Sequence, residues 1–260
     1  MGRPSLLSVL TCLLAVALPG AVPPNIVAEG VPAVTPALTT ELTPYLNLGG
    51  AGFRGWHATR REALVTTRVG DASHLHLMAA PLAKRVALTG GVEPVKSGRM
   101  QPGGTLLLYA ADRGGDENYQ LHLKDLADPQ AKPARLTDGK SRNLSACWSP
   151  DGRRIAYATN RRNGKDNDIV VVEARPPYAE RIVHAGTSSG WSPVEWSPDG
   201  ARLLLRQSLG QTETRLWTMD VATTTKSQVT SRTDRHYYAA AAFAEGGKTV
   251  VALADFGADF

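Results

Sequence analysis

Residues 186–190 read Gly-Thr-Ser-Ser-Gly and match G-x-S-x-G, the turn that carries the nucleophilic serine in many serine hydrolases. That turn must join a strand to a helix, so that the central hydroxyl stands free. Here an apolar strand pattern precedes the motif, but Trp191-Ser192-Pro193 follows it and no helical pattern begins. The triad also needs an acid and then a histidine downstream, and only His236 remains. We therefore interpret the segment as a loop and assign no catalytic residue.

The sequence contains one weak candidate for a metal-binding site. His74 and His76 are two apart, so on a strand their side chains share a face and could meet one ion. Two ligands are too few without a third at a fixed spacing, and we expect a surface or blade-edge pair. Asp112, Asp116 and Glu117 lack the spacing and glycine of a calcium loop, and are expected at a solvated hairpin tip. No metal or cofactor is predicted.

The chain has two cysteines, and Cys12 falls in an N-terminal segment described below. Cys147 would then be alone and could form no internal disulfide. It lies in the apolar stretch Leu-Ser-Ala-Cys-Trp at residues 144–148. We interpret it as a small buried hydrophobic residue rather than a nucleophile.

The strongest feature is an internal repeat, which we expect to position everything else. Trp-Ser-Pro-Asp-Gly at Trp148, Pro150, Asp151 and Gly152 recurs 48 residues later. Weaker copies begin at Met100, at Trp56 and at Phe243, so that successive anchors are 44, 48, 48 and 47 residues apart. The complete set of anchor residues is Trp56, Met100, Trp148, Pro150, Asp151, Gly152, Trp196, Pro198, Asp199, Gly200 and Phe243.

Each anchor has the chemistry of a strand that ends in a turn. The aromatic residue or methionine is expected to end a strand and point inward. Proline presets φ, aspartate accepts local backbone N–H bonds, and glycine adopts positive φ. Apolar strand patterns follow at once, as at residues 154–158 and 202–205, and two further strand patterns complete the unit. Four strands in about 45 residues are typical of a β-propeller blade, so the predicted fold class is all-β.

The repeat predicts four complete blades and a fifth that stops after its second strand. Half a blade would leave an open sheet edge, because a propeller closes by pairing its first and last blades. We therefore expect residues 45–260 to be a β-propeller fragment of a longer protein. The alternative is a four-bladed ring completed by a strand from residues 42–48.

The N-terminus differs in composition from the body. Arg3 is followed by an apolar run over residues 6–18 and by small residues, which is typical of a secretory signal peptide. We predict a signal peptide over residues 1–21, with cleavage after Ala21 or, as second choice, after Ala17. Residues 22–44 contain Pro23, Pro24, Pro32, Pro36 and Pro44 and are predicted to be an extended Pro-rich linker. The prediction is a secreted or periplasmic protein without a membrane span after cleavage.

The charge pattern argues against nucleic acid as a partner. Lysine and arginine number 29 against 24 acidic residues, which gives a formal net charge of +5. The basic residues are scattered through predicted turns, such as Arg153-Arg154 and Arg161-Arg162. A nucleic-acid surface needs basic residues gathered on one face with stacking aromatics.

Four stretches carry a resemblance to a known family: Gly-Trp-His-Ala-Thr-Arg-Arg-Glu-Ala-Leu (55–64), Arg-Gly-Gly-Asp-Glu-Asn-Tyr-Gln-Leu (113–121), Leu-Thr-Asp-Gly-Lys-Ser-Arg-Asn (136–143) and Ala-Tyr-Ala-Thr-Asn-Arg-Arg-Asn-Gly (156–164). From about residue 45 onward, the chain resembles the N-terminal propeller of the prolyl oligopeptidase family of serine peptidases, in its acylaminoacyl- and dipeptidyl-peptidase-like branch. The Trp-Ser-Pro-Asp-Gly units alone are less specific, because TolB-type propellers share them.

The resemblance implies a propeller that gates peptide substrates for a C-terminal α/β-hydrolase domain with a Ser-Asp-His triad, which would lie beyond residue 260. The expected partners are peptide substrates and that hydrolase domain. Some family members hold a peptide N-terminus with propeller acids, but nothing in the sequence matches Asp116 and Glu117 to those positions. The alternative function is a free-standing periplasmic propeller of the TolB type that binds other proteins.

Overall fold

A computed structural model of the chain describes residues 27–256, except 28, 47–49, 58, 71, 129 and 234. The chain divides into two compact units, residues 1–49 and residues 50–260. The predicted signal peptide, residues 1–21, lies outside the described residues. No helix among the residues described is long and apolar enough to cross a membrane.

In the described part of the first unit there is a helix, α1 (Pro36–Leu46), and all of its side chains are exposed. For residues 36–44 of the predicted linker, this helix replaces the extended conformation that we expected. The Thr35 hydroxyl accepts a hydrogen bond from the backbone N–H of Leu38 at 3.2 Å. Pro36 occupies the first helical position, where its missing N–H costs nothing. The Thr-Pro pair is therefore a helix-start signal within a proline-rich segment.

The second unit consists of antiparallel sheets, and four of them have four strands in simple sequence order. The first sheet is β1 (Ala51–Trp56), β2 (Ala63–Val69), β3 (Ala72–Met78) and β4 (Val86–Ala87). The second is β5 (Val95–Met100), β6 (Leu106–Ala111), β7 (Gln120–Asp125) and β8 (Ala134–Arg135). The third is β9 (Asn143–Trp148), β10 (Arg154–Thr159), β11 (Asp168–Glu173) and β12 (Glu180–His184). The fourth is β13 (Trp191–Trp196), β14 (Arg202–Ser208), β15 (Thr214–Asp220) and β16 (Lys226–Gln228).

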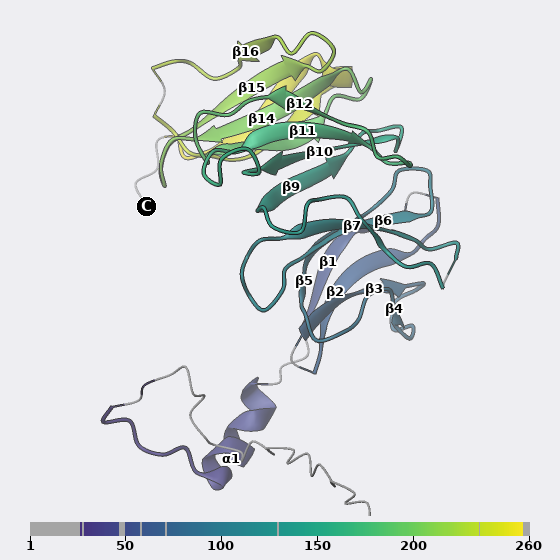
Figure 1. The fold of residues 1–260 in the computed structure, drawn as a ribbon, viewed down its shortest axis with the longest axis vertical. Coiled ribbons are helices and arrows are strands. Elements are labelled where there is room, and N and C mark those ends of the chain that lie inside the picture. The colour runs from purple at the N-terminus through teal and green to yellow at the C-terminus, as the bar shows by residue number, and fades with distance from the viewer. Residues whose placement is uncertain are drawn as a thin grey trace, which may run out of the picture. The chain divides into compact units, whose positions relative to one another are not determined.

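A fifth sheet has two strands, β17 (Tyr238–Ala244) and β18 (Thr249–Ala254), joined through the short 3-10 helix η1 (Glu245–Gly247). The sheets follow one another in chain order, and each packs on the next (Figure 1). These meandering sheets confirm the predicted β-propeller of four four-stranded blades and a half blade. The body begins at residue 50 by its contacts, rather than at residue 45.

The first strand of every sheet carries an irregularity of pairing. Its register with the second strand shifts by one residue, at Phe53/Gly55 in β1 and at Pro193/Glu195 in β13, and likewise in β5, β9 and β17. An inserted residue bends a strand and redirects its side chains. The first strands are therefore bent at the point where several of their side chains line cavities.

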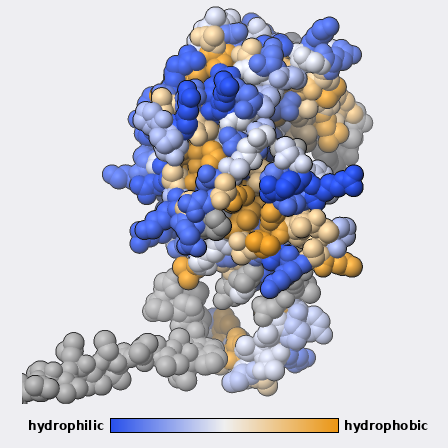
Figure 2. Space-filling view, turned by 90° about the vertical axis from the view of Figure 1, so that its right-hand side faces the viewer, coloured by the Kyte–Doolittle hydropathy of each residue, from blue (hydrophilic) through white to orange (hydrophobic). Residues whose placement is uncertain are grey.

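The core lies between neighbouring sheets, and one cluster, with Leu64, Leu75 and Leu107, joins the first and second. Ala156, Ile169 and Leu203 are fully buried in a cluster that joins the third and fourth sheets, and Ile155 and Val170 belong to the cluster that joins the second and third. On the face shown in Figure 2, hydrophilic side chains surround smaller groups of apolar residues.

The alternative closure by a strand from residues 42–48 is wrong. Residues 42–46 belong to α1, and residues 47–49 lie outside the described part of the chain. Among the described residues, β18 pairs only with β17.

Candidate functional site

The first strands of all five sheets line one cavity of about 480 Å³. These are β1, β5, β9, β13 and β17, and we call the cavity the central cavity. It brings together anchors that are far apart in the sequence. Its lining residues are Arg54, Gly55, Trp56, Arg99, Met100, Pro102, Cys147, Trp148, Pro150, Val194, Glu195, Trp196 and Ala241.

Hydrogen bonds between neighbouring sheets position this wall. The indole N–H of Trp148 donates to the carbonyl of Arg99 at 3.3 Å, and that of Trp196 donates to the carbonyl of Cys147 at 3.3 Å. Between the fourth and fifth sheets a carboxylate replaces the indole: the Glu195 carboxylate accepts a hydrogen bond from the backbone N–H of Phe243. Since buried indole N–H groups need partners, each tryptophan both fills the core and fixes the preceding strand.

The Trp-Ser-Pro-Asp-Gly turn is held by its serine and aspartate. Ser149 Oγ donates to Asp151 Oδ1 at 2.6 Å and accepts from the backbone N–H of Arg154 at 2.9 Å. Asp151 Oδ1 also accepts from the backbone N–H of Arg153 at 3.1 Å. The Ser149 hydroxyl and this N–H stabilise the carboxylate and lower the pKa of Asp151. Ser197, Asp199 and Arg202 repeat the arrangement, and the pKa of Asp199 is lowered for the same reason.

The turn glycines also receive an arginine from the preceding sheet. Arg154 Nη2 donates to the carbonyl of Gly200 at 2.9 Å, and its guanidinium lies 4.7 Å from the ring centre of Trp196. Arg202 makes the same pair of contacts with Gly247, at 2.5 Å, and with the ring of Phe243, at 5.3 Å. Gly200 adopts φ +68°, where only glycine is unstrained.

The anchors differ in how deeply they are buried. Trp148 and Trp196 are buried, at 8% and 4% exposure, and Met100 and Phe243 are half-buried. Trp56 is 69% exposed and packs on Phe53, with ring centres 5.2 Å apart. Trp56 therefore lines the central cavity without being buried in a core. Among the described residues no sheet precedes the first one, so Trp56 has no strand to cover it.

Cys147 is buried and free. Burial in the core raises the pKa of its thiol to about 12, so the thiolate does not form near neutral pH. Its place between the third and fourth sheets agrees with the interpretation as a packing residue.

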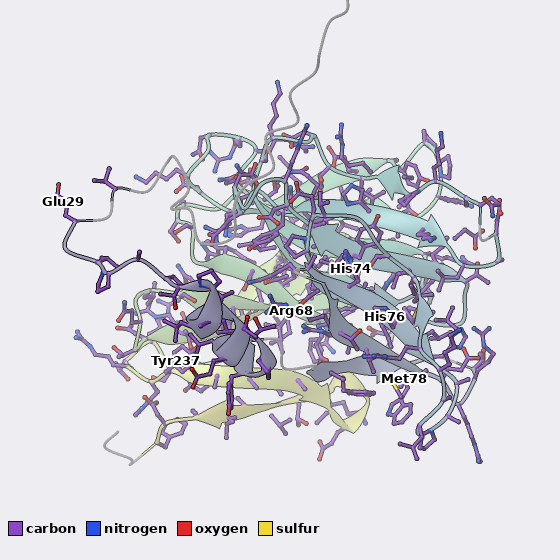
Figure 3. The ribbon with its side chains drawn as sticks, turned by 90° about the horizontal axis from the view of Figure 1, so that it is seen from below. Glu29, Arg68, His74, His76, Met78 and Tyr237 are labelled. Carbon is purple, nitrogen blue, oxygen red and sulfur yellow. The ribbon has the colours of Figure 1, made fainter. Side chains whose placement is uncertain are left out.

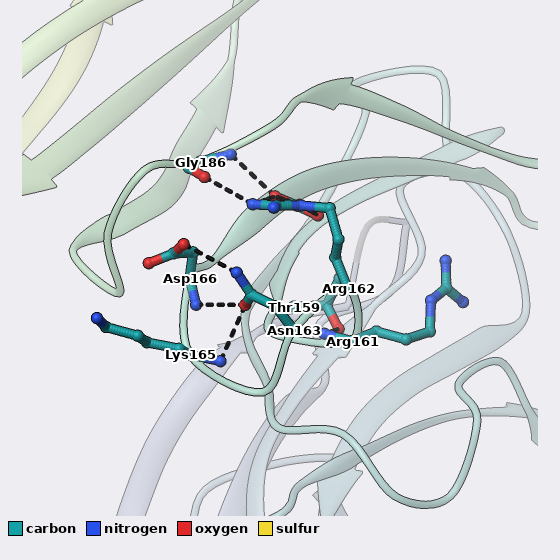
Figure 4. A network of polar contacts seen from close by, with 8 residues as sticks. Thr159, Arg161, Arg162, Asn163, Lys165, Asp166 and Gly186 are labelled. Atoms are coloured by element: carbon teal, nitrogen blue, oxygen red, sulfur yellow. Dashed lines mark hydrogen bonds and ion pairs between the residues drawn. The ribbon is translucent and has the colours of Figure 1, made fainter.

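The Gly-Thr-Ser-Ser-Gly segment joins β12 to β13 and is followed by a strand, not a helix. Asp168, which is 1% exposed, accepts hydrogen bonds from Arg162 Nε and Nη2 and one from the backbone N–H of Gly186 at 2.9 Å. Arg162 Nη2 also donates to the carbonyl of Gly186 at 2.7 Å (Figure 4). Asn167 donates to the carbonyls of Ser189 and Trp191. The segment is therefore a loop fixed by the neighbouring hairpin.

No catalytic geometry surrounds Ser188. Its Oγ accepts a hydrogen bond from the backbone N–H of Gly190 at 3.4 Å, and no histidine hydrogen-bonds to it in the part of the chain that is described. The sequence did not single out Arg162, Asn167 or Asp168 for this role. The only sign was the Asn-Arg-Arg-Asn-Gly stretch, which served as a family marker.

His74 and His76 lie on β3 inside the body, not on the surface (Figure 3), and are 4% and 6% exposed. This corrects the expected surface or edge pair. His74 Nε2 donates to the carbonyl of Gly91 at 3.0 Å, and His76 Nδ1 lies 3.0 Å from the Thr67 hydroxyl. No group of three or more metal-ligating side chains occurs among the residues that the structure describes. His76 is thus tied to β2 of its own sheet, and His74 to the connection that leads to β5.

The acidic residues 112–117 form an exposed, self-bonded tip. Asp112 accepts from the backbone N–H of Glu117 at 3.1 Å, and Asp116 accepts from that of Asn118 at 2.9 Å. Glu117 also forms an exposed ion pair with Arg142 at 3.3 Å. The contacts of Asp112 and Asp116 lie within the hairpin, and that of Glu117 reaches the loop before β9.

The sequence and the fold of this chain resemble those of known propeller proteins. Residues 90–252, more than half of the chain, match the family model described as prolyl oligopeptidase, N-terminal beta-propeller domain. Among solved structures, TolB from Acinetobacter baumannii is 15% identical with a TM-score of 0.58, covering 78% of this chain and 48% of that one. A prolyl endopeptidase is 12% identical with a TM-score of 0.58, covering 86% and 39%. A puromycin-hydrolysing peptidase of Mycobacterium tuberculosis is 18% identical with a TM-score of 0.51, covering 70% and 31%.

These identities support a shared fold only. The chain spans half or less of the length of each of these three structures. No curated protein sequence matches the chain.

Proposed function

The chain belongs to the family of prolyl oligopeptidase N-terminal β-propeller domains, and from this premise we propose that it gates and positions peptide substrates for an α/β-hydrolase serine peptidase domain. That domain would follow residue 260 and supply the Ser-Asp-His triad. The propeller itself contributes no nucleophile. Its partners are peptides and the hydrolase domain.

The observation that carries this proposal is the central cavity. Its volume of about 480 Å³ lies in the usual range for small-molecule sites, roughly 300–1,000 Å³, and suits a short peptide rather than a folded protein. Arg54, Arg99 and Glu195 supply charges of both signs, and three tryptophans supply apolar surface. A peptide backbone and its side chains need that mixture of partners.

The proposed location is the periplasm or the exterior of the cell. It rests on the signal-peptide pattern of residues 1–21. N-terminal sequencing of the protein secreted from its host tests this, and the expected mature start is Val22.

The direct test is peptide binding by the purified chain, followed by tryptophan fluorescence because Trp56, Trp148 and Trp196 line the cavity. An unstructured tetrapeptide should change the emission saturably. Arg99→Ala should weaken binding about tenfold, as expected for the loss of one charged contact. Arg113→Ala, which changes an exposed arginine outside the cavity, should bind like wild type. Equal binding by both variants, or none by wild type, would contradict the proposal.

The same preparation should not hydrolyse chromogenic peptides. Ser188 has no base beside it, so Ser188→Ala should leave any background rate unchanged. Turnover that disappears with Ser188→Ala would overturn the assignment of residues 186–190 as a structural loop.

A second candidate is a TolB-type propeller that binds other proteins. It is favoured by the similarity to TolB, with a TM-score of 0.58. The gene beyond codon 260 separates the two. A reading frame that encodes G-x-S-x-G followed by an aspartate and a histidine supports the peptidase, whereas a stop after further propeller repeats supports the TolB-type protein.

A further inference from the structure

A second cavity, of about 510 Å³, lies where the third and fourth sheets meet the loop that precedes β13. We call it the arginine cavity. The bulged start of β9, the fixed loop over residues 188–190 and the end of β14 contribute to it. Its lining residues are Leu144, Ser145, Asn167, Ser188, Ser189, Gly190, Trp191, Ser192, Arg206, Ser208, Leu209 and Gly210.

Arg206 is the only charged residue in this lining. Its Nε is buried without a hydrogen-bond partner. Within the part of the chain that is described, the Arg206 side chain forms no ion pair, hydrogen bond or ring contact. Arg162, Arg161 and Arg215 on nearby elements all have carboxylate partners. A half-buried guanidinium without an acceptor is unfavourable, so this position is suited to a ligand that brings the negative charge.

Serine hydroxyls surround the arginine. Those of Ser145, Ser189, Ser192 and Ser208 form no hydrogen bond among the described residues, and Ser188 accepts one from Gly190 but donates none. Ser192 and Arg206 are directly paired across β13 and β14. Hydroxyl donors beside a guanidinium fork match the oxygens of a carboxylate or a phosphate.

The rest of the lining favours a carboxylate attached to an apolar group. Leu144, Trp191 and Leu209 add apolar surface to the cavity. An inorganic anion would leave this surface without contact, whereas the last residue of a peptide presents a carboxylate next to a side chain.

The loop that carries the serines is rigidly held before any ligand arrives. The Arg162 guanidinium fixes the carbonyl of Gly186 (Figure 4), and the Asp168 carboxylate fixes its backbone N–H. Asn167 fixes the carbonyls of Ser189 and Trp191. A Cβ on Gly190 would collide with the carbonyl of Ser208, so the loop lies against β14 at this point. Preorganised donors bind with less loss of conformational entropy.

We propose that the arginine cavity binds the C-terminal carboxylate of a peptide, with Arg206 as the charged anchor and the surrounding serines as hydroxyl donors. This rests on the proposed function, because it names the end of the peptide substrate that the propeller holds. It makes the propeller selective for short peptides with a free C-terminus.

Calorimetric titration of the purified chain tests this with three probes: Ac-Ala-Ala-Ala-Leu with a free carboxylate, the same peptide as its C-terminal amide, and inorganic phosphate. The free acid should bind about tenfold or more tightly than the amide, the effect of a charge-assisted hydrogen bond. Arg206→Gln should remove that preference, and Arg206→Lys should restore only part of it, since lysine lacks the planar fork. Arg215→Gln on β15 is the matched control, because Arg215 does not line the cavity, and it should keep the preference. Circular dichroism confirms that each variant is folded.

The outcomes separate this proposal from the proposed function. Equal binding of acid and amide would overturn the carboxylate site and leave peptide binding intact. Phosphate binding that depends on Arg206, without peptide binding, would show an anion site and overturn both the peptide assignment and the proposed function. No binding of any probe would overturn both proposals.

Discussion

Trp196 and Trp56 occupy the same position of the repeat in two regions of the molecule, but only one of them is buried. Trp196, in the fourth sheet, is 4% exposed and donates its indole N–H to the third sheet, whereas Trp56, in the first sheet, is 69% exposed. In the last sheet, Val251 and Leu253 of β18 are 56% and 67% exposed. The repeat therefore specifies a hairpin with an aromatic end, and a neighbouring sheet is what buries that aromatic residue. We expect the stability of the body to be concentrated in the middle sheets.

The largest expected contrast is between these two tryptophans. Trp196→Ala removes a buried ring and its hydrogen bond and should lower the free energy of unfolding by about 3–5 kcal/mol. Trp56→Ala should lower it by less than about 0.5 kcal/mol, as expected for an exposed site. Urea denaturation followed by circular dichroism measures both. Similar losses in the two variants would show that burial does not distinguish the regions.

The second-largest loss of stability is expected from the hydrogen bonds of Asp168 at the junction of the third and fourth sheets. Asp168→Asn removes the carboxylate that accepts from Arg162 and Gly186, and should cost about 1.5–3 kcal/mol, the range for hydrogen bonds to charged groups. Asp166→Asn is the matched control in the same hairpin, because Asp166 is only half-buried and, among the described residues, its carboxylate accepts a hydrogen bond from Asn163 alone. An equal loss in the control would contradict the assigned role of Asp168.

The arginine that links successive sheets should have a smaller effect. Arg154→Ala loses the hydrogen bond to Gly200 and the contact with the Trp196 ring, and should cost about 1–2 kcal/mol. The neighbouring Arg153 is exposed and its side chain has no such contact, so Arg153→Ala should be neutral. If both substitutions are neutral, the repeated arginine contact does not stabilise the junction.

The smallest effect concerns pH. Burial, and then the ammonium of Lys226 at 3.2 Å, lower the pKa of His184 to about 4. As the pH falls below about 6.5, His184 takes up a proton in the unfolded chain before it does so in the folded protein. The free energy of unfolding should therefore be unaffected by His184 above pH 6.5 and should fall as the pH drops toward 4. After discounting for the partial exposure of the ring, the loss should be about 1 kcal/mol. His184→Gln should show less pH dependence in this window, and an unchanged dependence would exclude His184 as its source.

The parts of the fold that depend on local sequence could be predicted. Strand position, turn chemistry and blade count follow from repeated patterns, as at Trp148 and Asp151, because hairpins are specified within one unit. The exposure of Trp56 could not be predicted from the sequence, since it depends on which sheet lies beside this residue. The helix at residues 36–46 was missed because proline content was weighed above the Thr35-Pro36 start signal. The arginine cavity was missed because it joins residues from 144 to 210, and Arg206 reads as one more scattered basic residue.

The central claim is that the first strands of the five sheets form a peptide-binding wall. Hydrogen–deuterium exchange of the purified chain, with and without a saturating tetrapeptide, tests it most directly. Added protection should appear in β1, β5, β9, β13 and β17, with no change in β8, β12 and β16. Protection confined to those last strands, or none at saturation, would contradict the account.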